Sequence, residues 1–331
     1  MSNVKRNSGE QIIWLSILRT WAAFLVVVFH STFADEKNAF IGDFFVFFND
    51  IFSFRMPLFF FISGFLLFYT KIRTNSSYST ILKERVPRIL YPYVFITVVV
   101  FAAKFLFSSY VKRPVDISFV EFIGYFIYPH TSPWTNLWFL NVILIYFLLY
   151  PLIKKSLETW YGVAICLIVA VLLNLFFPKE TLLLGLSSVA VYFIYFYSGV
   201  VFAKINLISL LQKHTLLIGG IFAGLFIFSF LLEISIIQKI SGVVFCICLS
   251  LFCAKKIPSF FSSFRKYCYQ IYLFGVFFQI PISILYHRTS NLILLIGLSI
   301  LSVFIGIYAP VFVGKLIKKI NWLPLLKATG F

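Results

Sequence analysis

Long apolar stretches, separated by short polar segments, repeat along the whole chain. Each has roughly 17–25 residues, the length that an α-helix needs to cross the hydrocarbon core of a bilayer. The stretches lack the alternating pattern of membrane β-strands, so helices are predicted. The pattern predicts ten spanning helices, at residues 12–33, 51–70, 87–107, 136–153, 161–177, 185–203, 214–232, 236–254, 268–287 and 291–314.

Prolines and one short apolar stretch refine this pattern. Pro57 removes a backbone donor, so it is expected to kink or begin the second helix. Pro87 suits the first position of the third helix. The stretch from Ile117 to Tyr128 is too short to span and is expected to be interfacial or re-entrant. The following segment, 129–136, contains two prolines and is predicted to be a loop.

Composition agrees with a membrane location. Of 331 residues, 61% are apolar and 12% are charged, whereas a soluble domain averages about 45–50% apolar and about 25% charged residues. We expect an all-α integral membrane protein, a bundle of about ten transmembrane helices forming a single domain over residues 1–331. The first apolar run is too long for a signal-peptide core and stays as the first span. Five cysteines are interpreted as small apolar fillers without a metal site: Cys166, Cys246, Cys248, Cys253 and Cys268.

The net charge of +17 is distributed unevenly between the two predicted sides of the membrane. With the N-terminus in the cytoplasm, the cytoplasmic segments hold 19 Lys and Arg and the outer segments hold six, while the acidic residues number three and eight. The positive-inside rule then places both ends, residues 1–11 and 315–331, in the cytoplasm. Because the basic residues lie in short loops between spans, we expect a bilayer partner and no nucleic acid.

Two ionisable residues lie inside the first predicted helix, Arg19 and His30. Their spacing corresponds to three turns plus about 20°, so they share one face and lie roughly 16 Å apart along the axis. Arginine at the bilayer centre costs about 2.5–3.5 kcal/mol on insertion scales, and such residues are functional by default. Two other interpretations stay open: Arg19 extends to the headgroups, and His30 is a hydrogen-bonded structural histidine.

Two further candidate sites lie next in the chain. Ser63 and Gly64 either allow close helix packing or leave a groove for a narrow ligand. Arg85 and Arg88 lie in the most basic predicted cytoplasmic loop, beside a predicted helix start. Guanidinium groups at such a position suit a phosphate, although positive-inside charge explains them equally well.

These motifs resemble a known family. Arg19, followed after ten residues by His30, resembles the opening of the integral-membrane acyltransferases of the type-three family (acyltransferase 3). The segment 56–65 (MPLFFFISGF) is similar to the second-helix block of that family. The segment 85–93 (RVPRILYPY) is similar to its paired-arginine entry to the third helix.

Weaker blocks match later in the chain, at 138–140 (WFL) and 271–273 (IYL), so the resemblance extends in order over most of the sequence. Members often carry a histidine just after the late block, where this chain has Phe274 and Gly275. A role for a second histidine is therefore not expected here.

The resemblance implies an O-acyltransferase, usually an O-acetyltransferase, that uses acyl-CoA such as acetyl-CoA and modifies a cell-surface or lipid-linked polysaccharide. It also implies a multi-pass protein of the bacterial inner membrane. Acyl-CoA and an envelope glycan are then substrates, and no permanently bound cofactor is expected. The oligomeric state is not readable from the sequence.

On this hypothesis the CoA phosphates dock at Arg85 and Arg88. The pantetheine arm passes Arg19 through the gap at Ser63 and Gly64. His30 acts as a general base toward a sugar hydroxyl, or carries the acyl group transiently. Asp35 is the nearest carboxylate in sequence that would orient His30.

Two other classes fit the residues without the resemblance. A transporter or flippase of a lipid-linked glycan or small metabolite would use Arg19 and His30 as a substrate or proton site. A non-catalytic subunit of a polysaccharide synthase would use neither. Binding and cleavage of labelled acetyl-CoA separates an acyltransferase from both.

Overall fold

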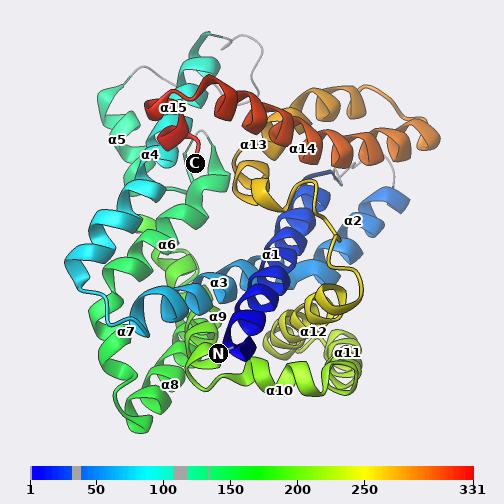
Figure 1. Ribbon diagram of the computed structural model, residues 1–331. Helices are drawn as coiled ribbons and strands as arrows, with labels where there is room; N and C mark the ends of the chain where they lie inside the picture. Colours follow the sequence, from blue (N-terminus) through cyan, green and yellow to red (C-terminus); the bar gives the residue numbers. More distant parts are fainter. Residues whose placement is uncertain (1, 32–38, 107–117, 133) are drawn as a thin grey trace. The chain divides into compact units, whose positions relative to one another are not determined.

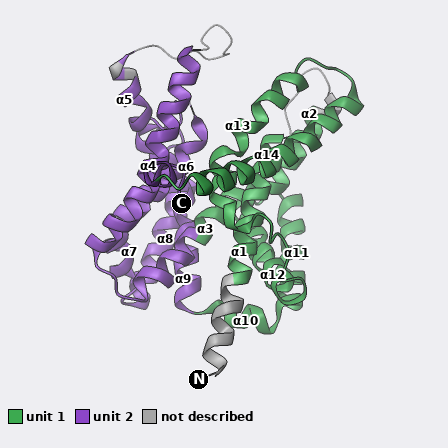
Figure 2. Cartoon of the chain, turned by 45° about the horizontal axis from the view of Figure 1, so that its top comes forward, with its two compact units in different colours: residues 1–62, 206–322 green, residues 63–205, 323–331 purple. Residues whose placement is uncertain are grey.

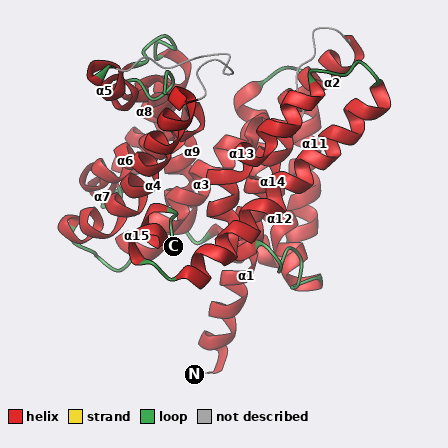
Figure 3. Cartoon of the chain, turned by 90° about the horizontal axis from the view of Figure 1, so that it is seen from above, coloured by secondary structure: helices red, strands yellow, loops and turns green. Residues whose placement is uncertain are grey.

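Every predicted span contains an α-helix in a computed structural model of the chain (Figure 1). The structure describes residues 2–31, 39–106, 118–132 and 134–331. Within these ranges all regular elements are helical and no strand occurs, as Figure 3 shows. The prediction of an all-α protein is therefore confirmed.

Seven helical segments of the described chain are long and apolar enough to cross a membrane, and up to nine if two bent helix pairs each count as one span. The bends are 58° and 102°. The predicted span at 161–177 corresponds to an apolar helix of 17 residues, shorter than each of the seven long segments. A multi-pass membrane protein is thus supported, whereas the count of ten is not confirmed and the side of each terminus stays a prediction.

The chain divides into two compact units that interleave along the sequence (Figure 2). Unit 1 comprises residues 1–62 and 206–322, and unit 2 comprises residues 63–205 and 323–331. The division falls inside helix α3 (Arg55–Leu67).

In unit 1, α1 packs against three other helices, α12, α13 and α14. Its buried face is apolar and includes Ile17, Leu18, Ala22 and Val27. The other helices of this unit pair as sequence neighbours, α11 with α12 and α13 with α14. The described elements are α1 (Ser2–Ser31), α2 (Ala39–Ile51), η1 (Phe52–Phe54), α10 (Leu207–Lys213), α11 (Thr215–Leu231), α12 (Ser235–Lys256), η6 (Arg265–Tyr267), α13 (Cys268–Tyr286) and α14 (Leu292–Ile320).

Small residues let two helices of unit 1 approach closely. A Cβ at Gly275 of α13 would lie 2.9 Å from the carbonyl oxygen of Gly306 of α14. A Cβ at Gly306 would lie 2.7 Å from a methyl carbon of Val27 and 2.9 Å from the amide nitrogen of Gln279. Only glycine therefore fits where α1, α13 and α14 meet.

Unit 2 is built around the packing of α8 on α9, with α6 against both α4 and α9. The last short helix, α15, packs on α4. Its elements after α3 are η2 (Phe68–Ile72, a π-helical turn), α4 (Tyr78–Leu106), α5 (Phe119–Ile127), η4 (Thr135–Leu137), α6 (Trp138–Leu148), α7 (Tyr150–Ser156), α8 (Trp160–Phe176), η5 (Leu183–Gly185), α9 (Leu186–Lys204) and α15 (Leu323–Ala328).

The two prolines used for prediction behave differently. Pro57 lies in the first turn of α3, as expected of a proline that begins a helix. Pro87 lies inside α4, which begins at Tyr78, so its placement at the first helical position was wrong. The hydroxyl of Ser77 accepts a hydrogen bond from the backbone N–H of Thr80, at 3.2 Å. This cap begins the helix nine residues before Pro87.

His130 lies in the turn between α5 and η4, in unit 2. Its ring stacks on Trp138 with 5.7 Å between centroids, and its Nε2 lies 3.1 Å from the hydroxyl of Ser188. Burial in this setting lowers the pKa of His130 from its ordinary value. The folded protein therefore resists protonation at this position.

This burial predicts how stability depends on pH. Because the unfolded chain binds the proton more readily, stability is highest above the unfolded pKa of about 6.5 and is lost as the pH falls from there through the lower pKa of folded His130. Thermal unfolding in detergent should therefore show a smaller loss of stability on acidification for His130→Gln than for the wild type. His214→Gln, a change at an exposed histidine, is the control. Equal acid sensitivity of the His130→Gln variant and the wild type would contradict the prediction.

Candidate functional site

The two ionisable residues of the first span lie on one continuous helix, α1. Arg19 is exposed, while its neighbours Leu18 and Thr20 are buried. His30 is half-buried and lies in the last turn of the helix. The helix therefore presents Arg19 away from its packed face.

An aromatic ring and a cation surround His30. The ring of Phe29 meets the His30 ring edge to face, with 5.1 Å between centroids. The guanidinium carbon of Arg55, at the start of α3, lies 3.6 Å from the centre of the Phe29 ring, in cation–π contact. A positive charge thus lies in the immediate surroundings of the imidazole, and Arg55 acts electrostatically on His30.

The short 3₁₀ turn η1, which joins α2 to α3 within one long helical segment, holds Arg55 in place. Its Nη2 donates to Oδ1 of Asn49 at 3.0 Å, and its Nη1 donates to the carbonyl of Phe52 at 3.0 Å and that of Asn49 at 3.4 Å. The carbonyl of Phe52 also accepts the backbone N–H of Arg55, so the side chain and the backbone of Arg55 share one acceptor. The guanidinium is therefore fixed by several bonds, which favours one orientation.

A buried glutamine anchors the helical turn that carries His30. Nε2 of Gln279 in α13 lies within hydrogen-bonding distance of the carbonyl of Val27 at 2.9 Å, the hydroxyl of Ser31 at 2.6 Å and the carbonyl of Ser302 at 3.3 Å. All three side chains, of Gln279, Ser31 and Ser302, are 1% exposed or less. Because two of these acceptors are carbonyls, the amide nitrogen must face them. The end of α1 is thereby tied to both α13 and α14.

Sequence reasoning missed Arg55 and Gln279 as neighbours of His30. Each carried a signal, since a cation and an amide within apolar helices are costly without partners. Asp35, the predicted orienting carboxylate, lies outside the described residues.

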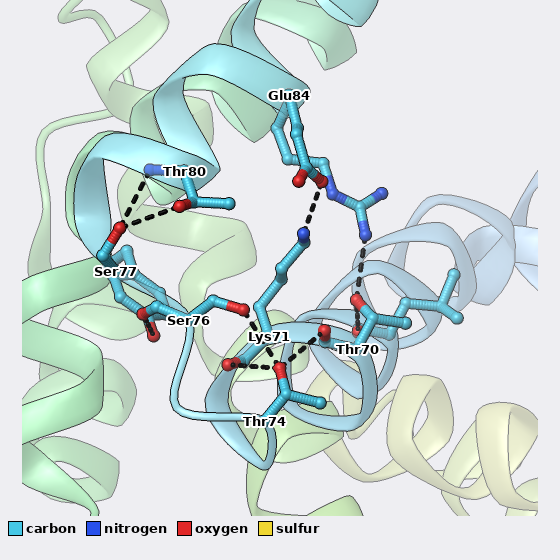
Figure 4. A network of polar contacts seen from close by, with 10 residues as sticks. Thr70, Lys71, Thr74, Ser76, Ser77, Thr80 and Glu84 are labelled. Carbon is cyan, nitrogen blue, oxygen red and sulfur yellow. Dashed lines mark hydrogen bonds and ion pairs between the residues drawn. The ribbon is translucent and has the colours of Figure 1, made fainter.

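Unit 2 contains the predicted phosphate site. Arg85 is half-buried on α4, and its guanidinium donates to the hydroxyl of Thr70 at 2.9 Å. Arg88 follows one turn later and is exposed. The adjacent Lys71 and Glu84 form an ion pair (Figure 4). Glu84 also interacts electrostatically with Arg85 and Arg88. Both arginines lie inside α4, which begins at Tyr78, so their predicted position beside a helix start was wrong.

Ser63 and Gly64 also lie in unit 2, where α3 meets α9. A Cβ at Gly64 would lie 1.9 Å from the carbonyl oxygen of Phe196. This contact agrees with the packing interpretation, because the backbone of α9 fills the space beside Gly64. A binding role for Ser63 and Gly64 stays a prediction.

The six predicted site residues are thus divided between the two units. Arg19 and His30 share α1 in unit 1, and the other four, Ser63, Gly64, Arg85 and Arg88, belong to α3 and α4 in unit 2.

Comparison with known proteins adds one finding. A sequence model described as an acyltransferase domain, of the acyltransferase 3 family, matches residues 12–311. The match covers most of the chain and runs through both units. No curated protein and no solved structure matches the chain.

Proposed function

The chain belongs to the acyltransferase 3 family, and from this premise we propose that it is an O-acyltransferase that moves an acyl group, most often acetyl, from acyl-CoA to a hydroxyl of a cell-surface or lipid-linked polysaccharide. That it is a multi-pass membrane enzyme transferring acyl groups follows from the family and the apolar helices. The CoA donor, the polysaccharide acceptor and the bacterial inner membrane are parts of the proposal.

The observation that carries the proposal is the setting of His30. A histidine inside a span, with a fixed guanidinium nearby and a helix end anchored by Gln279, is a preorganised pair of base and cation. In the proposed reaction the neutral imidazole takes the proton of the sugar hydroxyl. The hydroxyl oxygen forms a bond to the thioester carbonyl carbon, the carbon–sulfur bond breaks, and CoA leaves as the thiolate, which takes the proton from the imidazolium and so returns His30 to its neutral form.

Arg55 has a proposed role in this step. Negative charge develops on the carbonyl oxygen as the hydroxyl attacks, and a nearby fixed cation stabilises it without reorganisation. Its hydrogen bonds to Asn49 and Phe52 supply the rigidity that this role requires.

The test of the proposal uses purified protein and acyl-CoA labelled in its acyl group. Transfer of label to an envelope glycan, with release of free CoA, is the expected result. Glycan transport across vesicles without thioester cleavage would instead identify a transporter and reject the proposal. Mass spectrometry of envelope glycans, with and without the protein, identifies the acyl group and its acceptor from the mass difference.

The phosphate-docking part of the proposal has its own test. Charge reversal in Arg85→Glu combined with Arg88→Glu should raise the KM for acyl-CoA at least about tenfold, because charge-assisted bonds to phosphate are lost and repulsion is added. The matched control is Lys83→Glu, which reverses an exposed charge on the same helix. Steady-state kinetics in detergent distinguish the two. An unchanged KM in the double variant would reject this docking site.

A further inference from the structure

A pocket of about 320 Å³ opens in unit 2, at the turn that joins η2 to α4. Its lining comes from the start of α4 and from α7, and includes Ser76, Ser77, Tyr78, Tyr150, Lys154 and Lys155. A volume of about 300–1,000 Å³ is typical of small-molecule sites. The pocket does not include Arg85 or Arg88, so it is separate from the docking site proposed above.

Hydrogen bonds fix the frame of this pocket. The hydroxyl of Tyr150 donates to the carbonyl of Ser76 at 2.9 Å, and that of Tyr78 donates to the carbonyl of Leu148 at 3.1 Å. The two tyrosine rings stack nearly parallel, with 6.5 Å between centroids. The turn itself is closed by bonds among its own hydroxyls, including those of Ser77 and Thr80 (Figure 4). The walls are therefore in place before a ligand binds.

The charges of the pocket favour an anion. The ammonium group of Lys154 donates to the neutral amide oxygen of Asn75 at 2.6 Å. The backbone of Asn75 is in the left-handed conformation, with φ of 51°. Lys155 is exposed. Glu158 also lines the pocket, yet among the described residues it forms no ion pair with either lysine. Two cations against one carboxylate leave a net positive charge.

The apolar surroundings suggest where the anion comes from. Leu148, the last residue of α6, and Leu152 in α7 are 46% and 66% exposed. Exposed leucines on a membrane protein face the acyl chains of lipid. Lys154 and Lys155 also belong to the side that the charge bias assigns to the cytoplasm, where anionic headgroups attract basic residues.

We propose that this pocket binds a phosphate ester, with Lys154 and Lys155 as the cationic partners. The ligand chemistry is supplied either by the headgroup of an anionic phospholipid, which the neighbouring leucines favour, or by a soluble phosphate ester. The proposal does not depend on acyl transfer, because its readout is binding alone.

The experiment has two arms, both with the full-length protein. In the first, native mass spectrometry counts the phosphatidylglycerol molecules retained by protein released from mixed phosphatidylglycerol–phosphatidylcholine nanodiscs. In the second, calorimetry in detergent measures the affinity for glycerol 3-phosphate, a soluble phosphate ester that is not part of CoA. Wild type is compared with Lys154→Gln combined with Lys155→Gln, and with Lys213→Gln as a control at an exposed lysine outside the pocket.

The double variant should bind either phosphatidylglycerol or the soluble phosphate ester about tenfold or more weakly than wild type does. The Lys213→Gln variant should bind both ligands within about twofold of wild type. Loss in the first arm identifies a lipid site, and loss in the second a soluble ligand. Because Lys154 also holds Asn75, Lys155→Gln alone is included and should show a partial loss even if the double variant folds poorly. Equal losses in Lys155→Gln and Lys213→Gln, or no loss in either arm, would overturn the proposal.

Discussion

The His30→Ala variant is expected to lose at least about 100-fold in the rate of acyl transfer, with the fold and the membrane insertion intact. General bases contribute about 10²–10⁴-fold to catalysed rates. The rate is measured with purified protein and labelled acyl-CoA, at saturating concentrations of both substrates.

The matched control is His214→Ala, which removes an exposed histidine at the start of α11. That variant should transfer at the wild-type rate. The loss in His30→Ala should appear in kcat more than in the KM for acyl-CoA, since a base acts in the transition state. If His30→Ala transfers at the wild-type rate, the base is another group and the mechanism proposed for this site is wrong.

Two experiments separate the two roles considered for His30, general base and covalent acyl carrier. A general base is partly replaced by small exogenous bases, so imidazole added to His30→Ala should restore part of the rate. A covalent acyl carrier would leave an acylated enzyme that can be trapped by acid quenching and located by peptide mass spectrometry. Labelled His30 in the trapped wild type would replace the base mechanism by a two-step transfer.

The apolar pattern predicted the helices because each span is long and uniformly apolar, and backbone groups in lipid must bond internally. It misplaced the start of α4, because Pro87 was a stronger local signal than the cap at Ser77. The residues of the first turns of α4 are polar and look like a loop. A serine can cap the backbone N–H of the third residue after it at any helix start. Such a cap can be recognised in a sequence only when the position of the helix start is already known.

The surroundings of His30 were beyond the reach of the sequence for a different reason. Arg55 and Gln279 are separated from His30 by 25 and 249 positions, and the contacts that place them near the end of α1 are tertiary. Helical spacing predicts which residues share one face of one helix, but it does not state which face of another helix packs beside them. The close approach of α13 and α14 at Gly275 and Gly306 decides that.

Replacing Gly64 with alanine is expected to destabilise the protein strongly, whereas the same replacement at Gly224 is not. The new Cβ would lie 1.9 Å from the carbonyl oxygen of Phe196, a backbone atom that moves only if α3 and α9 separate. Overpacking a helix interface costs about 1–3 kcal/mol, and more where the obstacle is backbone. The melting temperature in detergent, followed by circular dichroism, should fall accordingly.

Gly224→Ala supplies the control for this prediction, because a Cβ at Gly224 of α11 meets no atom within 4 Å. It should leave stability unchanged or raise it slightly, since alanine favours a helix over glycine by about 1 kcal/mol. Kinetics of the folded fraction of Gly64→Ala then decide whether Ser63 and Gly64 form a packing contact or a groove for the ligand. Wild-type KM for acyl-CoA in that fraction shows that Gly64 only packs α3 on α9. A raised KM at an unchanged melting temperature shows instead that the space beside Gly64 belongs to the acyl donor.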